Sequence, residues 1–70
     1  MYSVGQKVVI NFYSHESGRW EWYEDTAIVT RLLPSCRDYE VSSKHSGVMN
    51  VSEDKSRAAF VAGLETGEAV

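Results

Sequence analysis

The sequence predicts a small, mainly β domain that closes as a barrel, and three observations support this fold class. Apolar and polar side chains alternate with a period of two in the run that begins at Val4, which is typical of a strand with one buried face. The longest run of aromatic and β-branched residues, 20–33, ends at the only proline, Pro34. Shorter β-prone runs follow, separated by turns that contain glycine or serine.

The chain is long enough for one domain only. A chain of 70 residues buries about 60% of its unfolded surface when it folds, which leaves room for a single small core. Hydrophobic residues make up 43% and charged residues 24%, so the composition is that of an ordinary folded domain. We expect the barrel over residues 1–62 and a loose tail over residues 63–70.

The first strand is expected over residues 4–12, with a sharp entry at Gly5. The polar segment 13–19, which contains Gly18, predicts a long loop of the kind that often carries function. One face of the strand is expected to lie in the core: Val4, Gln6, Val8, Ile10 and Phe12.

The central strand is expected over residues 20–33, because Pro34 cannot donate a hydrogen bond to a ladder. Branched apolar side chains occur on both of its faces, which predicts that the strand is either shared between two sheets of the barrel or covered on both sides. A bulge near Glu24 and Asp25 is expected where its register changes. The side chains expected inside the barrel are Ala27, Val29 and Leu33.

Two shorter strands are expected in the second half of the chain. Residues 37–42 place Tyr39 and Val41 on one face, as a strand with a buried side would. A turn over residues 43–47 then leads into a strand over residues 48–51. The inward-facing pair of the first of these strands should add to the core.

The segment 53–62 allows two interpretations. The capping residue Ser52 is followed by two acidic residues, which is typical of a helix start, and the alanines of the segment favour a helix. Phe60 and Val61 are equally compatible with a strand. The segment is therefore either one helix or a tight turn over residues 53–57 with a closing strand.

Four short segments occur in a recognisable order and spacing: Val4-Gly5-Gln6-Lys7-Val8, Thr26-Ala27-Ile28-Val29, Tyr39-Glu40-Val41 and Asn50-Val51-Ser52-Glu53-Asp54. Over roughly residues 3–61 this order resembles the SH3-like barrels of the Tudor and KOW group. The resemblance implies a five-stranded SH3-like barrel with a short 3₁₀ turn before the last strand. It therefore favours the turn and closing strand over the helix.

The resemblance also implies a non-enzymatic binding module. Tudor domains hold methylated lysine or arginine in an aromatic cage, and KOW-type domains contact RNA or RNA polymerase partners. Phe12 matches the cage aromatic at the end of the first strand, and Tyr23 lies near the one on the second. The turn where the family carries its other cage aromatics has Ser43, His45 and Ser46 here, so the implied cage is incomplete.

Aromatic and acidic residues are interleaved around the first loop and the start of the central strand. This combination favours a cationic partner, through cation–π attraction and charge pairing. In a strand, Trp20 and Trp22 share one face and Glu21 and Tyr23 the other, so at most one of these pairs can fill the core. The residues expected to bind a partner are Phe12, Tyr13, Trp20, Trp22, Tyr23, Glu24 and Tyr39.

No residue pattern indicates an enzyme, a metal site or a cofactor. His15, Cys36 and His45 fall on separate expected loops without the paired spacing of zinc ligands. The adjacent carboxylates Glu24 and Asp25 point to opposite faces of a strand, so they cannot flank one bond. The sequence contains no glycine-rich phosphate loop, nucleophile elbow or dinucleotide fingerprint.

Charge and hydropathy limit the class of partner and the cellular location that the sequence predicts. The net charge of −3 argues against dense contact with a phosphate backbone, so a nucleic acid is a weaker candidate partner than a protein. No apolar run approaches the roughly 18 residues that cross a bilayer, and the N-terminus lacks a secretory signal pattern. The single Cys36 is typical of a reducing compartment. We therefore expect a cytoplasmic protein that does not enter a membrane.

These observations predict a small protein-binding domain that acts as a stand-alone regulator, adaptor or inhibitor, without an attached catalytic domain. Its partner would be a larger protein, contacted through a cationic segment. Two alternatives stay open. One is a KOW-like or Tudor-like module that stacks RNA bases on Trp20, Trp22 or Tyr23. The other is a structural subunit that self-associates in a larger assembly.

Overall fold

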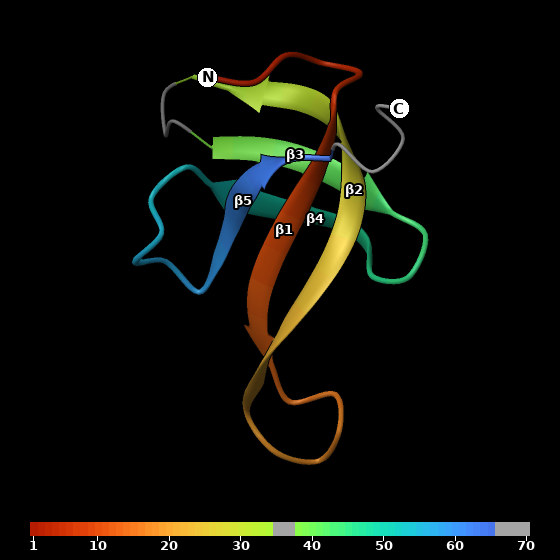
Figure 1. Cartoon of the computed structure of the whole chain (residues 1–70), viewed down its shortest axis with the longest axis vertical. Coiled ribbons are helices and arrows are strands. Elements are labelled where there is room, and N and C mark those ends of the chain that lie inside the picture. Colours follow the sequence, from red (N-terminus) through yellow and green to blue (C-terminus); the bar gives the residue numbers. More distant parts are fainter. Residues whose placement is uncertain (35–37, 66–70) are drawn as a thin grey trace.

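The structure is a computed structural model that describes residues 1–34 and 38–65. Five strands form a closed ring in the order β1-β2-β3-β4-β5, and the described residues contain no helix (Figure 1). The prediction of a mainly β domain is therefore confirmed. The strands are β1 (Lys7–Ser14), β2 (Glu21–Leu33), β3 (Asp38–Ser43), β4 (Gly47–Ser52) and β5 (Ala59–Leu64).

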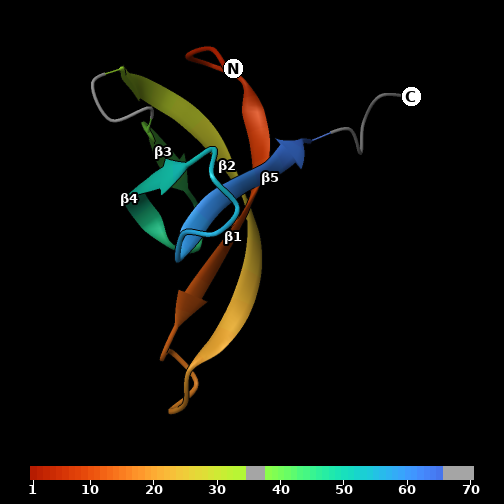
Figure 2. The same ribbon diagram turned by 90° about the vertical axis from the view of Figure 1, so that its left-hand side faces the viewer.

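Strands β1 and β2 form a long antiparallel hairpin. Their pairing runs without a register shift from Lys7 opposite Ile28 to Ser14 opposite Glu21. The hairpin extends well beyond the other strands, as both views show (Figures 1 and 2). Its end is therefore covered by no other strand of the described structure.

The prediction of a bulge near Glu24 and Asp25 is wrong, because the ladder between β1 and β2 is regular there. The irregularity in β2 lies instead between Val29 and Arg31, where the strand pairs with β3. Strand β2 pairs with β1 as far as Ile28 and with β3 from Ile28 onward. The register shift thus occurs just after the strand passes from one neighbour to the next, and bulges commonly bend strands at such points.

All five strands contribute to one core of mainly branched aliphatic side chains. Strand alternation places these side chains on the inner face of the ring. The buried hydrophobic residues are Val8, Ile10, Phe12, Ala27, Val29, Tyr39, Val41, Val51 and Val61. The inward positions expected for the first strand at 8, 10 and 12, for the central strand at 27 and 29, and for the third at 39 and 41 are among them.

Two ends of the predicted strands lie outside the core. Val4 is 59% exposed and Gln6 is half-buried, because residues 3–6 form a turn in which the Gln6 N–H donates to the Ser3 carbonyl at 3.1 Å. Gly5 has a φ of 93° in that turn, which glycine adopts without strain. Leu33 is only half-buried, since β2 has left the core at its end.

The segment before β5 is a turn rather than a helix. The Arg57 N–H donates to the Asp54 carbonyl at 3.1 Å, and residues 53–58 contain no 3₁₀ helix. Strand β5 then pairs antiparallel with β1, from Ala59 opposite Phe12 to Leu64 opposite Val8. A helix in this segment would lose that ladder and the burial of an apolar side chain on β5.

Strand β5 ends at Leu64, so residues 63 and 64 of the expected tail belong to the sheet. Residues 66–70 of that tail lie outside the described residues. The ring closes through a parallel contact between β4 and β5 at one residue pair, Ser52 opposite Phe60. Across residues 1–34 and 38–65, no helix is long and apolar enough to cross a membrane.

Candidate functional site

The β1–β2 hairpin has an inner and an outer face that carry different aromatic rings. Phe12 pairs with Tyr23, and Tyr13 pairs with Trp22 in the next position of the ladder. Neighbouring positions of a strand point to opposite faces. Phe12 is 6% exposed, whereas Tyr13 is 44% and Trp22 is 53% exposed. The first pair therefore faces the core and the second faces outward.

On the outer face, aromatic side chains contact one another in series. The Tyr13 ring stacks on Trp20 with centroids 5.6 Å apart and lies 5.2 Å from Trp22. Beyond Trp20 lies the His15 ring at 5.4 Å, and beyond Trp22 lies the Phe60 ring at 5.7 Å. We call this set, in spatial order His15, Trp20, Tyr13, Trp22 and Phe60, the aromatic row.

The aromatic row is formed by side chains of β1, β2, β5 and the segment that joins β1 to β2. Trp20 is 62% exposed, so its contact with Tyr13 leaves more than half of its surface accessible. Soluble monomers rarely expose contiguous apolar patches of this kind unless they serve in recognition. Aromatic rings also contribute much contact area for little loss of side-chain entropy, since they have few rotatable bonds.

The inner face of the hairpin is organised around Tyr23. Its ring stacks on Phe12 at 5.7 Å. Its hydroxyl accepts a hydrogen bond from the Ser17 N–H at 3.1 Å and donates to the Glu21 carboxylate at 3.2 Å. Ser17 Oγ also donates to Glu21, and Arg19 Nε lies 4.0 Å from the same carboxylate. These contacts stabilise the conformation of the loop at the tip of the hairpin.

The acidic residues near the aromatic row have separate roles. Asp25 lies on the inner side, where its carboxylate accepts hydrogen bonds from the hydroxyls of Ser43 and Ser46, the second at 3.2 Å. The hydrogen bond from Ser43 is the main cause that holds the pKa of Asp25 below its ordinary value. Asp25 thus ties the β3–β4 turn to β2 and is not available to a partner of the outer face.

Glu24 is the acidic residue that shares the outer face of β2 with Trp22. It is exposed, and it pairs across the ladder with Asn11. The ion pairs among residues 1–34 and 38–65 do not include Glu24. Its carboxylate is therefore open to solvent beside the aromatic row.

The seven residues that the sequence suggested for partner binding fall into two groups. Tyr13, Trp20, Trp22 and Glu24 lie together on the outer face of the hairpin. The others point inward: Phe12, Tyr23 and Tyr39. Phe12 and Tyr39 are buried in the core, so an outer-face contact surface excludes them.

Tyr39 pairs with Leu32 near the end of β2 and so lies far from the hairpin tip, which precedes the start of β2. It is 5% exposed, and its hydroxyl accepts a hydrogen bond from the Tyr2 N–H at 3.0 Å and donates to Glu53. Burial of the ring is the main cause that raises the pKa of Tyr39. The residue anchors the N-terminal segment to the core.

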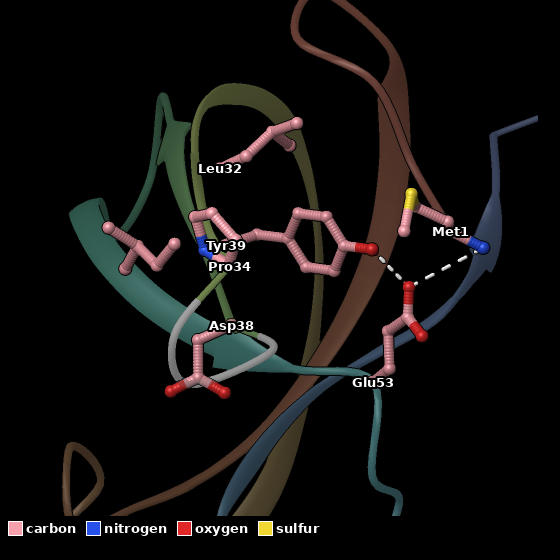
Figure 3. A pocket seen from close by; sticks show the side chains of 7 residues that line it. Met1, Leu32, Pro34, Asp38, Tyr39 and Glu53 are labelled. Atoms are coloured by element: carbon pink, nitrogen blue, oxygen red, sulfur yellow. Dashed lines mark hydrogen bonds and ion pairs between the residues drawn. The ribbon is translucent and has the colours of Figure 1, made fainter.

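A pocket of about 390 Å³ opens beside Tyr39 (Figure 3). Its apolar wall comes from the end of β2, and the carboxylates of Asp38 and Glu53 lie at its edge, where the N-terminal ammonium is 3.5 Å from Glu53. The lining residues are Met1, Leu32, Leu33, Pro34, Asp38, Tyr39 and Glu53.

The residues considered for metal or cage chemistry do not form such sites in the described structure. Within residues 1–34 and 38–65, no group of three His, Cys, Asp or Glu side chains could hold a metal ion. His15 ends the aromatic row, and Cys36 lies outside the described residues. Phe12 and Tyr23 stack directly on each other, so they do not form the facing walls of a cage.

Two members of the aromatic row were missed at the level of sequence. Phe60 is 38 positions after Trp22 in the chain and joins it because β5 pairs with β1, with Phe60 opposite Asn11. His15 lies in the loop where the sequence places it, directly after β1, and contacts Trp20. Alternation along one strand could have suggested His15, whereas Phe60 required the strand order.

No protein-family model, no curated protein and no solved structure matches this chain. The arrangement of the described side chains is therefore the basis for a functional proposal.

Proposed function

We propose that this chain is a non-enzymatic protein-binding module with an SH3-like barrel architecture, and that it contacts a larger protein through the aromatic row. One observation carries the proposal. Trp20 and Trp22 both contact Tyr13 on the β1–β2 hairpin, yet the three side chains are 44–62% exposed. Tryptophan and tyrosine are the residues that most often dominate the energy of protein interfaces.

The connectivity supports the SH3-like architecture. The strands follow one another around the ring, β1 pairs with both β2 and β5, and the long β2 is shared by two neighbours. A short turn leads from β4 into β5, and β4 meets β5 in parallel at one position. This arrangement fits the order of elements from which the SH3-like resemblance was inferred.

The shape and charge of the surface favour a protein partner with a cationic segment. The hairpin projects from the ring (Figure 2), so its outer face can enter a concave site or lie along an extended segment. The chain has a net charge of −3, which attracts cationic surfaces and repels a phosphate backbone. Cationic side chains are also attracted to the faces of exposed aromatic rings.

A domain of this kind acts by occupying a surface of its partner, as a regulator, adaptor or inhibitor does. The proposal includes a cytoplasmic setting, in agreement with a single cysteine in the sequence. We expect the interface to be centred on the two tryptophans, with the rest of the outer face excluding water around them.

The proposal can be tested by affinity capture from lysate with the wild-type chain and a Trp20→Ala/Trp22→Ala variant. The partner should be captured by the wild type and lost from the double variant. A Val4→Ala/Val48→Ala variant is the matched control, because it removes two exposed apolar side chains that lie outside the aromatic row. Each chain should show a single cooperative unfolding transition in urea, which establishes that it is folded. If the folded double variant captures the same proteins as the wild type, the proposal is wrong.

A second candidate function is binding of single-stranded RNA, which the series of exposed stacked rings favours, since bases stack on such rings. Ionic strength separates the two candidates. Binding to RNA should weaken steeply as salt rises because counterions are released from the phosphates. A protein interface centred on aromatic rings should weaken only slightly.

A further inference from the structure

The Trp22 end of the aromatic row carries three side chains on adjacent positions of the outer face. Glu24, Asn11 and Phe60 occupy one line across β2, β1 and β5, because Asn11 is opposite both of the others. Trp22 lies two residues before Glu24 on the same strand and on the same face. Residues two apart in a strand are separated by about 6.6 Å, so the side chains of Trp22 and Glu24 leave the strand close together on one face.

The Trp22 ring is fixed in position and still accessible. Tyr13 holds it on one side, with ring centroids 5.2 Å apart and planes tilted by 48°. Phe60 also contacts it, at 5.7 Å with an interplanar angle of 64°. Neither neighbour stacks flat on the indole, and the residue remains 53% exposed. A ring face is therefore available to a planar group.

Glu24 provides a negative charge beside that ring. The other two acidic residues of this part of β2 have partners in the structure, since Glu21 contacts Arg19 and Asp25 accepts hydrogen bonds from Ser43. Glu24 is exposed and has no ion pair in the part of the chain that the structure describes. Its neighbour in the ladder, Asn11, carries no charge.

We propose that Trp22, Glu24 and Phe60 form a subsite for an arginine side chain of the partner. The guanidinium plane stacks on the Trp22 indole, and its N–H groups donate to the Glu24 carboxylate. Phe60 supports the ring and covers the aliphatic part of the arginine. This inference rests on the proposed protein-binding function and specifies one side chain of the partner.

Arginine fits this subsite better than lysine for a geometric reason. The guanidinium is planar, stacks on aromatic faces and presents two parallel N–H groups to a carboxylate. A lysine ammonium is a compact point charge that keeps its water more strongly. The subsite offers a flat ring and a carboxylate side by side, which a planar cation contacts simultaneously.

The test is a nuclear magnetic resonance titration of the full chain with three short peptides of the sequence Ser-Gly-X-Gly-Ser, acetylated and amidated at their ends. X is arginine, lysine or citrulline, the last being an uncharged analogue of arginine. We expect the arginine peptide to shift the indole N–H resonance of Trp22 at millimolar concentration. The lysine peptide should bind about three- to tenfold more weakly, and the citrulline peptide weaker still.

Glu24→Gln should lower the affinity for the arginine peptide about three- to tenfold and leave the ring contacts intact. Glu40→Gln is the matched control, because it changes the net charge equally at a residue on β3, away from the aromatic row. It should bind the peptide as the wild type does. The inference is overturned if the Trp22 resonance does not move, if arginine and citrulline peptides bind equally, or if the two variants behave alike.

These outcomes differ from failure of the proposed function. If lysate capture depends on the tryptophans while Glu24→Gln has no effect on peptide binding, the binding surface is correct and the arginine subsite is wrong. If capture does not depend on the tryptophans, the proposed function fails, whatever the peptides do.

Discussion

Tyr13 and Trp22 lie directly opposite each other in the β1–β2 ladder, with ring centroids 5.2 Å apart, and both remain about half exposed. One position away in the same ladder, Phe12 and Tyr23 form the corresponding inner pair, with centroids 5.7 Å apart. The same regular pairing thus builds part of the core on one side and a solvent-facing aromatic surface on the other. Substitutions of neighbouring residues in this ladder should therefore differ in their effects on stability and on binding.

Substitution of the adjacent residues Phe12 and Tyr13 should have unequal effects on folding. Phe12→Ala leaves a cavity in the core and should lower the free energy of unfolding by about 3–5 kcal/mol. Tyr13→Ala removes only outer-face ring contacts and should cost about 1 kcal/mol. Urea denaturation followed by circular dichroism measures both values. Equal losses for the two variants would contradict the assignment of inner and outer faces.

Stability should decrease in acid partly through Asp25. The pKa of its carboxyl is lowered from an ordinary value of 3.8, chiefly by the hydrogen bond from Ser43. A folded-state pKa below the unfolded one contributes stability that is present above pH 3.8 and is lost as the pH falls through the folded-state pKa. Asp25→Asn should therefore be less stable than the wild type at neutral pH, and the two should converge in acid.

Urea midpoints measured from neutral pH down to about pH 2 would show this convergence. Ser43→Ala removes the main hydrogen-bond donor to Asp25. Like Asp25→Asn, it should make the free energy of unfolding less dependent on acid pH. Parallel pH profiles for the wild type and Asp25→Asn would show that this carboxylate does not stabilise the fold.

Tyr39 should make the fold sensitive to alkaline pH. Its pKa is raised from 10.0, first by burial and then by the hydrogen bond to Glu53. A raised folded-state pKa contributes stability that is present below pH 10.0 and is lost as the pH rises through the folded-state value. Tyr39→Phe should cost about 1 kcal/mol at neutral pH through the lost hydrogen bonds, and it should lose less stability than the wild type in alkali.

The alkaline measurement is a series of urea denaturations between neutral pH and about pH 11. Tyr13→Phe is the matched control, because it removes the hydroxyl of an exposed tyrosine. Its alkaline profile should follow that of the wild type. The assignment would be contradicted if Tyr39→Phe lost stability in alkali as steeply as the wild type.

The β3–β4 turn should depend on glycine at position 47. Gly47 has a φ of 77°, a region that residues with a side chain adopt at a cost of about 1–2 kcal/mol. Gly47→Ala should lower the free energy of unfolding by that amount. Gly63→Ala is the control, since Gly63 is not in the positive-φ region and an added Cβ there meets no atom within 4 Å. A Gly63→Ala loss as large as that of Gly47→Ala would show that backbone conformation is not the cause.

The sequence by itself determined the strand periodicity, and with it several local features of the fold and the site. Alternation put Val8, Ile10 and Phe12 on one face, and it put Trp20 and Trp22 together on a face opposite Tyr23. These relationships are confirmed because side-chain direction in a strand depends only on the position of a residue along that strand. The sequence alone therefore predicts which of these residues share a face of a strand, without knowledge of which strands lie beside it.

The tertiary structure decided which strand lies beside which, and so completed the aromatic row. Phe60 reaches Trp22 only through the pairing of β5 with β1, and Asp25 meets Ser43 only where β2 approaches the β3–β4 turn. The sequence predicts a register shift near Glu24 and Asp25, whereas the structure has it after Val29. The shift occurs there because β2 changes its neighbour at that point. Contacts between distant segments depend on the closure of the ring, and the local alternation of side chains carries no information about that closure.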